Sequence, residues 1–192
     1  MGKAAFLDRD GVINRKAKPG EYVTRWEEMH ILPGVAASIT LLNQAGFRVM
    51  VASNQRCVAK GLITTADLDA MHRRMCDHLA SSGAMIDSIY YCPHDPPCDC
   101  RKPALGMLLA AARQHQLDLS ESWMIGDSEI DVAAGRNAGC RTARVITEGE
   151  RAVGSADVVA QSLPDAIRQI LQLESVAGIT AAHRTQHEKR FA

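Results

Sequence analysis

Short apolar segments alternate with amphipathic helical patterns along this chain of 192 residues. Runs typical of buried strands end at Leu7 and cover 47–52, 86–91, 123–125 and 141–146, and a short edge strand is expected over 157–159. Helical spacing of apolar residues lies between these runs, up to a last helix over 163–173. Strands that alternate with helices pair in parallel, because each helix carries the chain back across the sheet. We therefore predict an α/β fold with a doubly wound, mainly parallel, Rossmann-like sheet.

The length of the chain suits one domain with a sizeable core, which we place at residues 1–174. Residues 175–192 are polar and lose the helical periodicity, so we expect a mobile tail. Lys+Arg and Asp+Glu both total 22, which gives no electrostatic case for nucleic acid or an anionic membrane. The N-terminal apolar run is too short for a signal peptide, and no window is apolar enough to span a bilayer. These features predict a cytoplasmic monomer without nucleic-acid or membrane partners.

Two carboxylates stand at the end of the first strand. Asp8 and Asp10 follow the apolar run one residue apart, and Gly11 comes next. Residues at i and i+2 of a strand face the same way, and a turn at Gly11 can re-aim the second carboxylate. Two anions this close repel each other unless a cation compensates them, and Mg²⁺ is the hard cation that oxygen ligands favour. We predict a magnesium site here, with different chemical roles for Asp8 and Asp10.

Polar side chains also follow three more of the expected strands. Because parallel strands present their carboxyl ends at one edge of the sheet, these side chains should lie close together. Ser53 follows the second strand, Lys102 follows a cysteine-rich loop after the third, and Asp127 follows the fourth. Asp131 lies one helical turn beyond Asp127, where it can orient Lys102 or a metal-bound water, or simply cap the helix. Carboxylates, a metal, a hydroxyl and a lysine together favour phosphoryl transfer, because they bind anions and stabilise the charge of a moving phosphoryl group.

Each of these groups has an expected role. Asp8 is the candidate nucleophile on phosphorus, and Asp10 would protonate the departing alkoxide and later deprotonate water. Ser53 and Lys102 would hold the phosphate oxygens. Asp8, Asp10 through a backbone carbonyl, and Asp127 are the expected Mg²⁺ ligands.

The loop after the third expected strand gathers three cysteines and a histidine: Cys92, His94, Cys98 and Cys100. Three thiolates and one imidazole form the closed four-ligand set of a structural Zn²⁺. A chain without an export signal seldom forms disulfides, so metal binding is the better interpretation. The predicted zinc loop, residues 92–100, would aim Arg101 and Lys102 at the strand-end site.

Four motifs occur in the order and spacing of one known family: Asp8-Arg9-Asp10-Gly11, Ser53-Asn54, Lys102 and residues 126–131. With these motifs the chain resembles the haloacid dehalogenase (HAD) superfamily of phosphatases over about residues 4–146. The resemblance implies a HAD-like fold, and it implies the nucleophile, acid/base, phosphate-binding and Mg²⁺ roles at the matching positions.

The zinc loop and the following Cys100-Arg101-Lys102-Pro103 are similar to a small branch of this superfamily that lacks a large cap domain. That branch contains phosphatases of D-glycero-D-manno-heptose 1,7-bisphosphate and of histidinol phosphate. Residues 54–61 are closer to the heptose enzymes, although Cys57 stands where these have a glycine and Lys60 where they have an arginine. The resemblance thus implies release of the C7 phosphate of the heptose bisphosphate, in nucleotide-heptose synthesis for lipopolysaccharide or another surface glycan. Histidinol-phosphate hydrolysis in histidine biosynthesis is the alternative.

A small sugar bisphosphate would need a second cationic contact beyond the lysine at the reacting phosphate. The candidates for this contact are Arg56, Lys60 and Arg101. The motifs contain three further expected substrate contacts, Asn54, Gln55 and Ser128.

Two functions of other kinds are weaker alternatives. A phosphatase acting on nucleic-acid ends is disfavoured by the neutral charge and the lack of interleaved aromatic and basic residues. A non-enzymatic, zinc-stabilised binding module would be expected to lose catalytic residues, yet the chain retains Asp8, Asp10, Lys102 and Asp127.

Overall fold

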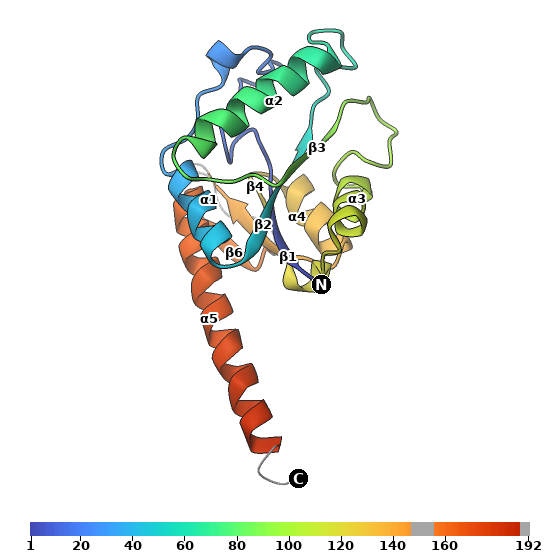
Figure 1. The fold of residues 1–192 in the computed structure, drawn as a ribbon. Helices are drawn as coiled ribbons and strands as arrows, with labels where there is room; N and C mark the ends of the chain where they lie inside the picture. The colour runs from blue at the N-terminus through green and yellow to red at the C-terminus, as the bar shows by residue number, and fades with distance from the viewer. Residues whose placement is uncertain (147–155, 189–192) are drawn as a thin grey trace.

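A six-stranded parallel sheet forms the centre of the computed structural model, which describes residues 1–146 and 156–188 (Figure 1). The strand order across the sheet is β3-β2-β1-β4-β5-β6. The strands are β1 (Lys3–Leu7), β2 (Phe47–Asn54), β3 (Ser88–Cys92), β4 (Trp123–Gly126), β5 (Arg141–Val145) and β6 (Val158–Ala160). The predicted strands are all present, and the predicted doubly wound α/β fold is confirmed.

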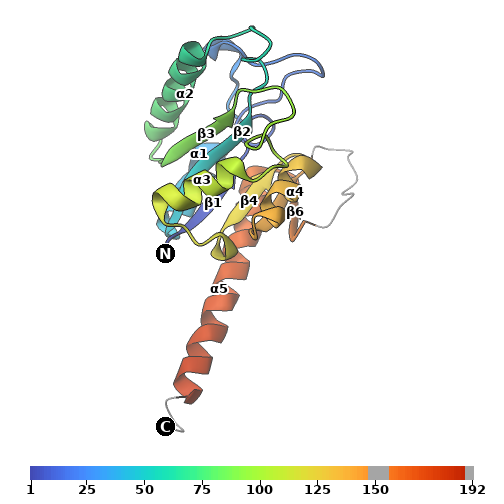
Figure 2. The same ribbon diagram turned by 90° about the vertical axis from the view of Figure 1, so that its right-hand side faces the viewer.

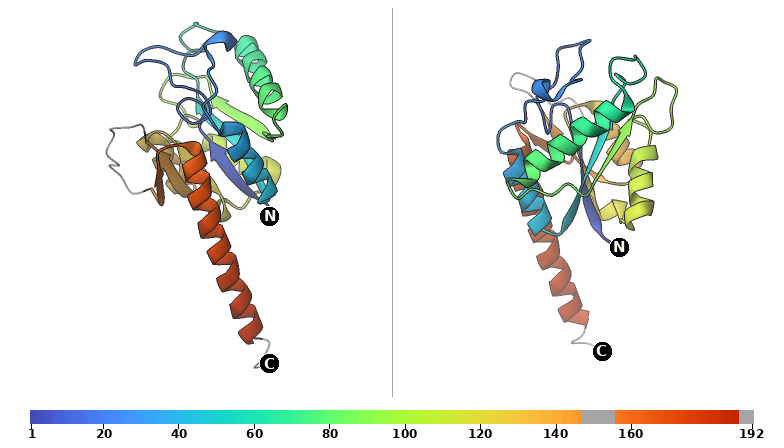
Figure 3. Two further views of the ribbon diagram at one scale, coloured as in Figure 1. Left: turned by 90° about the vertical axis from the view of Figure 1, so that its left-hand side faces the viewer. Right: turned by 45° about the horizontal axis from the view of Figure 1, so that its top comes forward.

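Helices cover both faces of the sheet, so the strands are apolar on both sides. Ala5 and Leu7 of β1 belong to a core shared with the apolar residues of α1 (Val35–Gln44), α2 (Thr65–Ala80) and the first turns of α5 (Leu163–Glu188). Ala4 and Phe6 face the other core, which is closed by α3 (Gly106–His115) and α4 (Glu129–Asn137). Figure 2 looks onto the side of α3 and α4, and the left view of Figure 3 onto that of α1 and α5.

The order of the strands reverses at β1, which lies between β2 and β4. Leu7 is level with Val51 of β2 and with Ile125 of β4, and the Asp8 amide donates to the Ile125 carbonyl at 2.9 Å. The residues that follow these strands therefore meet at one edge of the sheet. Open α/β sheets bind ligands at such a switch point.

Two loops rise above this edge. Residues 8–34, which we call the flap, connect β1 to α1 and contain one short 3-10 turn, η1 (Trp26–Glu28). The cysteine-containing loop lies between β3 and α3, and a second 3-10 turn, η2 (Leu119–Glu121), precedes β4. The described part of the chain holds no separate cap domain, as predicted. None of its helices is both long and apolar enough to cross a lipid bilayer.

Helix α5 corrects one prediction. Its first turns bury Leu163, Ala166, Ile167 and Ile170, but the helix continues to Glu188, well beyond the expected end near residue 173. Figure 1 shows this part extending away from the sheet. Apolar periodicity marks a buried face, and this part of the helix leaves the sheet, so the pattern did not mark it. The predicted mobility of the tail stays a prediction, and residues 189–192 lie outside the described residues.

Candidate active site

Asp8 and Asp127 approach each other across the turn that follows β1. The Asp8 carboxylate accepts a hydrogen bond from the Arg9 amide at 2.7 Å, which orients it at the end of the strand. Gly11 has a φ of +93°, and a Cβ at this position would lie 2.4 Å from Oδ2 of Asp127. A glycine is needed here for both its backbone conformation and its size. The Asp-x-Asp-Gly pattern thus encodes close contact between two strand ends.

The Asp10 carboxylate is held by three side chains. Arg9 Nη2 lies 3.0 Å from Oδ1 and 2.9 Å from Oδ2, Asn14 donates to Oδ1 at 2.9 Å, and Gln55 donates to Oδ2 at 3.0 Å. Burial opposes the charge of this carboxylate, but Arg9 and the hydrogen bonds prevail and lower the pKa of Asp10. Asp10 is therefore fixed in orientation and does not share the contacts of Asp8.

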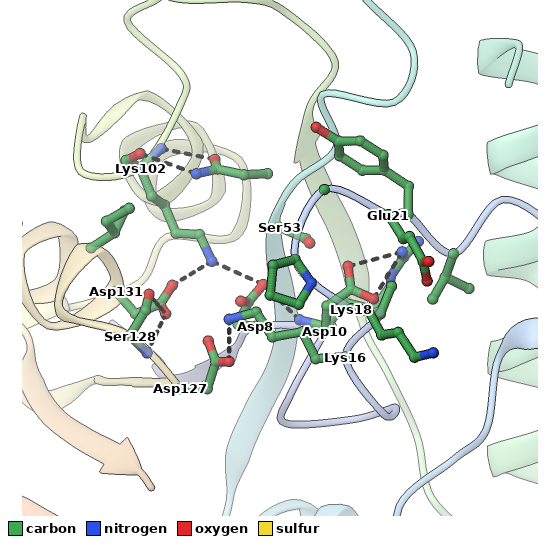
Figure 4. A pocket seen from close by; sticks show the side chains of 18 of the residues that line it. Asp8, Asp10, Lys16, Lys18, Glu21, Ser53, Lys102, Asp127, Ser128 and Asp131 are labelled. Atoms are coloured by element: carbon green, nitrogen blue, oxygen red, sulfur yellow. Dashed lines mark hydrogen bonds and ion pairs between the residues drawn. The ribbon is translucent and has the colours of Figure 1, made fainter. Parts of the chain in front are cut away.

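Lys102 is buried and forms the cationic centre of the site (Figure 4). Its ammonium lies 3.0 Å from Asp8 Oδ1 and 2.6 Å from Asp131 Oδ1, and it donates to the Ala52 carbonyl at 2.6 Å. Burial opposes the charge, but the two carboxylates raise the pKa of Lys102 above its ordinary value. The Asn54 side chain pairs twice with the Lys102 backbone, each time at 3.0 Å. This pairing fixes the lysine against the end of β2.

Asp131 performs both of the tasks that the sequence left open. Its Oδ2 accepts from the Ser128 hydroxyl at 2.6 Å and from the Ser128 amide at 3.1 Å, which caps α4, while its Oδ1 contacts Lys102. Asp127 instead pairs with Lys16 of the flap at 2.6 Å. The Ser128 side chain, an expected substrate contact, is engaged in this cap.

Three carboxylates form a donor set for a hard divalent cation. Asp8, Asp127 and Asp131 each offer one oxygen, and these oxygens lie within 4.8 Å of one another. Burial, with the neighbouring carboxylates, raises the pKa of Asp8 to about 7 against the effect of Lys102. Burial also raises the pKa of Asp127, although Lys16 opposes this. The site thus holds more negative charge than its own cations compensate, so its chemistry fits Mg²⁺, with Asp131 in addition to the expected ligands.

These groups line a pocket of about 480 Å³, which is large enough for a small phosphorylated sugar. The strand-end residues and flap residues 16–23 line the pocket together. Of the predicted substrate contacts, Asn54, Ser128 and Arg101 belong to the lining, as does Ser53.

Three other predicted contacts lie elsewhere. Gln55 is buried, where it donates to Asp10 and, at 2.8 Å, to Ser53. Arg56 pairs with Asp95 of the cysteine loop, and the Lys60 ammonium lies 4.9 Å from the Tyr22 ring centre. Neither of these two cations lines the pocket.

The four metal-binding candidates of the cysteine loop face one another. His94 Nδ1 lies 3.2 Å from Cys98 Sγ and 3.4 Å from Cys100 Sγ, and these two sulfurs are 3.0 Å apart. Cys92 Sγ is 3.7 Å from Cys98 Sγ, and all six described cysteines are free thiols. The hydrogen bond from Cys100 lowers the pKa of Cys98 to about 6. Three thiols and one ring nitrogen, all within 4.8 Å, fit a tetrahedral Zn²⁺.

The chain is similar to proteins of a known family. The model of the family described as HAD-hydrolase-like matches residues 99–168. A D-glycero-beta-D-manno-heptose-1,7-bisphosphate 7-phosphatase of Rhodopseudomonas palustris is 43% identical over 145 residues, which cover 71% of this chain and 79% of that protein. The enzyme of the same name from Bordetella bronchiseptica is 38% identical over 177 residues, which cover 91% of this chain and 96% of that one.

The chain belongs to the HAD superfamily of hydrolases. Solved structures of this superfamily share its architecture. The D,D-heptose 1,7-bisphosphate phosphatase of B. bronchiseptica, crystallised with magnesium and phosphate, superposes with a TM-score of 0.80 at 36% identity and covers 88% of this chain and 98% of its own. A putative HAD-like phosphatase of Mesorhizobium loti reaches a TM-score of 0.77 at 30% identity and covers 89% and 87% of the two chains. The predicted membership is therefore confirmed.

In this HAD protein, the structure adds residues that sequence analysis missed. Lys16 and Lys18 of the flap line the pocket, and Lys16 pairs with Asp127. The Lys-x-Lys spacing after the first motif was a visible signal, but a polar loop alone gives no position for its charges. Arg9 stands within the first motif, and nothing in the pattern indicates that its side chain is buried beside Asp10.

Proposed function

We propose that this protein is a Mg²⁺-dependent phosphatase that removes the C7 phosphate of D-glycero-D-manno-heptose 1,7-bisphosphate. The observation that carries the proposal is the convergence of Asp8, Asp10 and Lys102 on one sugar-sized pocket, in a chain whose curated relatives have this activity in their names. Those relatives favour the heptose over histidinol phosphate. The pathway expected from the resemblance, nucleotide-heptose synthesis for a surface glycan, is part of the proposal.

In the first step, an Asp8 carboxylate oxygen attacks phosphorus and the bond from phosphorus to the C7 oxygen breaks. Asp10 gives its proton to the departing alkoxide, which would otherwise be a poor leaving group. Arg9 lowers the pKa of Asp10 in the free site, and a bound phosphate dianion opposes that shift because it is a nearby like charge. The products of this step are the 1-phosphate sugar and an aspartyl-phosphate at Asp8.

In the second step, Asp10 acts as a base. It takes a proton from a water molecule that attacks phosphorus, the bond from phosphorus to the Asp8 oxygen breaks, and inorganic phosphate leaves. Ser53 and Lys102 bind the non-bridging oxygens in both steps, where the negative charge must be stabilised. Both side chains are nearly fully buried at the base of the pocket, so they need little reorganisation.

Asp8 and Asp127, with Asp131 beside them, would hold the Mg²⁺, together with the backbone carbonyl expected at Asp10. When bound, the cation supplies positive charge that reduces repulsion between the Asp8 nucleophile and the phosphate. Cys92, His94, Cys98 and Cys100 would hold a structural Zn²⁺. Asn54 connects the end of this loop to β2 through the Lys102 backbone, which supports a role for the loop in positioning the lysine.

Arg101 is the proposed contact to the second phosphate. It lines the pocket, and its buried Nη1 has no hydrogen-bond partner among the described residues. A buried guanidinium nitrogen is normally paired, so an anionic ligand is a fitting partner. Arg56 and Lys60 receive less support, because they lie outside the lining. We also propose that the protein acts in the cytoplasm as a monomer.

The test is phosphate release from heptose 1,7-bisphosphate and from histidinol phosphate, measured side by side with Mg²⁺. We expect kcat/KM to be higher for the heptose by about a hundredfold, the scale of one or two lost charged contacts. Arg101→Met should remove most of that preference without removing activity on a monophosphate. A preference for histidinol phosphate would contradict the proposed substrate, and no hydrolysis of any phosphate ester would contradict the proposed chemistry.

A further inference from the structure

Beside the acid/base residue lies a buried arginine, which also contacts a buried histidine that the proposed mechanism does not use. Arg9 is 1% exposed and contacts Asp10 through Nη2. Its Nη1 lies 3.2 Å from Nε2 of His72, which is 3% exposed and comes from helix α2. The guanidinium therefore lies between the Asp10 carboxylate and a histidine 63 positions further along the chain.

The chemistry of this contact fixes the state of the imidazole. A guanidinium can only donate hydrogen bonds, so Nε2 of His72 must accept with its lone pair. The ring is then neutral and carries its proton on Nδ1, which has no partner among the described residues. His72 is thus an acceptor aimed at Arg9, and it adds no second positive charge beside the arginine.

The His72 ring also packs against a neighbouring aromatic ring. Tyr91 of β3 packs edge-on against it at 5.4 Å between ring centres, and the Tyr91 hydroxyl donates to Asp69 at 2.7 Å. Aromatic packing of this kind restricts the ring orientation. The result is a series of contacts from α2 and β3, through the buried side chains of His72 and Arg9, to the carboxylate that must transfer the proton.

We propose that His72 is a positioning residue, which orients Arg9 and through it the Asp10 carboxylate. The inference rests on the proposed function, since it assigns a role in leaving-group protonation. Arg9 makes the only contact that reaches both Asp10 oxygens among those described, so a rotation of its guanidinium would turn the carboxylate. Asn14 and Gln55 each hold a single oxygen and would limit the rotation without preventing it.

The test separates positioning from a merely structural role by the choice of leaving group. An alkoxide needs a proton from Asp10 to depart, whereas p-nitrophenolate leaves without one. We therefore compare kcat/KM, which reports the steps up to leaving-group departure, for heptose 1,7-bisphosphate and for p-nitrophenyl phosphate. The variants are His72→Leu, which keeps an apolar side chain but no acceptor, and His72→Gln, which offers an oxygen acceptor to Arg9. His78→Leu, on the same helix but in contact with Trp26, is the matched control.

We expect His72→Leu to lower kcat/KM for the sugar phosphate by about tenfold to a hundredfold, the scale of a displaced catalytic group. The value for p-nitrophenyl phosphate should change by less than about threefold, and His72→Gln should restore the sugar phosphate value to within a similar factor. Thermal melts establish that each variant is folded at the assay temperature.

Three results would overturn the inference. They are an equal loss on both esters, no loss on either, or a His72→Gln variant as impaired as His72→Leu. A wild-type protein that hydrolyses neither ester would overturn the proposed function and this inference with it.

Discussion

Both candidate metal sites gather donor atoms that bind cations, but among the described residues only the donors of the active site pair with cationic side chains. Asp8 and Asp131 contact Lys102, Asp127 contacts Lys16, and Asp10 contacts Arg9. In the cysteine loop, the described hydrogen bonds of the three sulfurs run to one another and to His94. Cationic side chains thus balance part of the negative charge at the active site, whereas the described contacts of the cysteine loop include no such cation.

This difference indicates which metal the activity depends on and which metal the stability of the fold depends on. Buried charges that are already paired can be tolerated in a folded protein. Four ligand atoms that face only one another have no such partner, so a bound cation must supply the stabilisation. We therefore expect loss of Mg²⁺ to remove activity and leave the fold, and loss of Zn²⁺ to weaken the fold itself.

The largest effect should come from Asp8→Asn, which removes the nucleophile but not the shape of the site. We expect kcat to fall by at least about a thousandfold, because an amide cannot form the phosphoryl intermediate. The melting temperature should not fall, since one of several crowded carboxylates becomes neutral. The exposed Asp77→Asn is the control, and near-normal turnover by Asp8→Asn would rule out the nucleophile assignment.

Lys102→Met should come next, because it leaves Asp8 and Asp131 without their internal cation. We expect kcat to fall by about a hundredfold to a thousandfold. The free energy of unfolding should fall by about 3–5 kcal/mol, as is typical when one partner of a buried ion pair is removed. Chemical denaturation measures this loss, and added Mg²⁺ should restore part of it. Arg113→Met, on an exposed arginine of α3, is the control. Equal effects of the two variants would show that the buried cation contributes no more than an exposed one.

A smaller effect on turnover is expected from Cys98→Ser. Elemental analysis should find about one Zn²⁺ per wild-type chain and little in the variant, because a closed zinc site needs all four ligands. The melting temperature should drop, and kcat should fall by about tenfold as Lys102 is positioned less well. Cys76→Ser, on a half-buried cysteine outside the loop, should keep both zinc and stability. Full zinc content in Cys98→Ser would contradict the ligand assignment.

The smallest effect concerns pH. Burial and then Arg9 lower the pKa of His72 to about 4, from an ordinary value of 6.5. The unfolded chain therefore binds more protons between these values, so the stability that depends on neutral His72 is present above pH 6.5 and is lost as the pH falls toward 4. Between pH 7 and pH 5 the wild type should lose about 2 kcal/mol more than His72→Gln. Denaturant titrations at the two pH values measure the difference, and parallel behaviour of the two proteins would show that His72 titrates normally.

Local sequence patterns were sufficient to predict the positions of the strands and the residues that gather at their ends. Asp8, Asp10, Ser53 and Asp127 stand at the ends of expected strands, and Lys102 follows the loop after another. Parallel strands bring such positions together at one edge of the sheet. The clustering of the cysteine loop was equally predictable, because its four candidate ligands lie within nine residues and the chain has little freedom to separate them. The extent of α5 could not be predicted from apolar periodicity, because that signal marks a buried face and the end of this helix leaves the sheet.

The sequence by itself thus determined the fold class, the strand-end carboxylates and lysine, and the cysteine cluster, since each depends on short-range spacing. Only the tertiary structure decided how the charges are paired: Lys16 with Asp127, Arg56 with Asp95 away from the pocket, and Gln55 behind Asp10. The same is true of His72, which reaches Arg9 from a helix far along the chain. Such pairings depend on how helices and loops pack across the sheet, and the type of a polar residue does not indicate which partner it will contact.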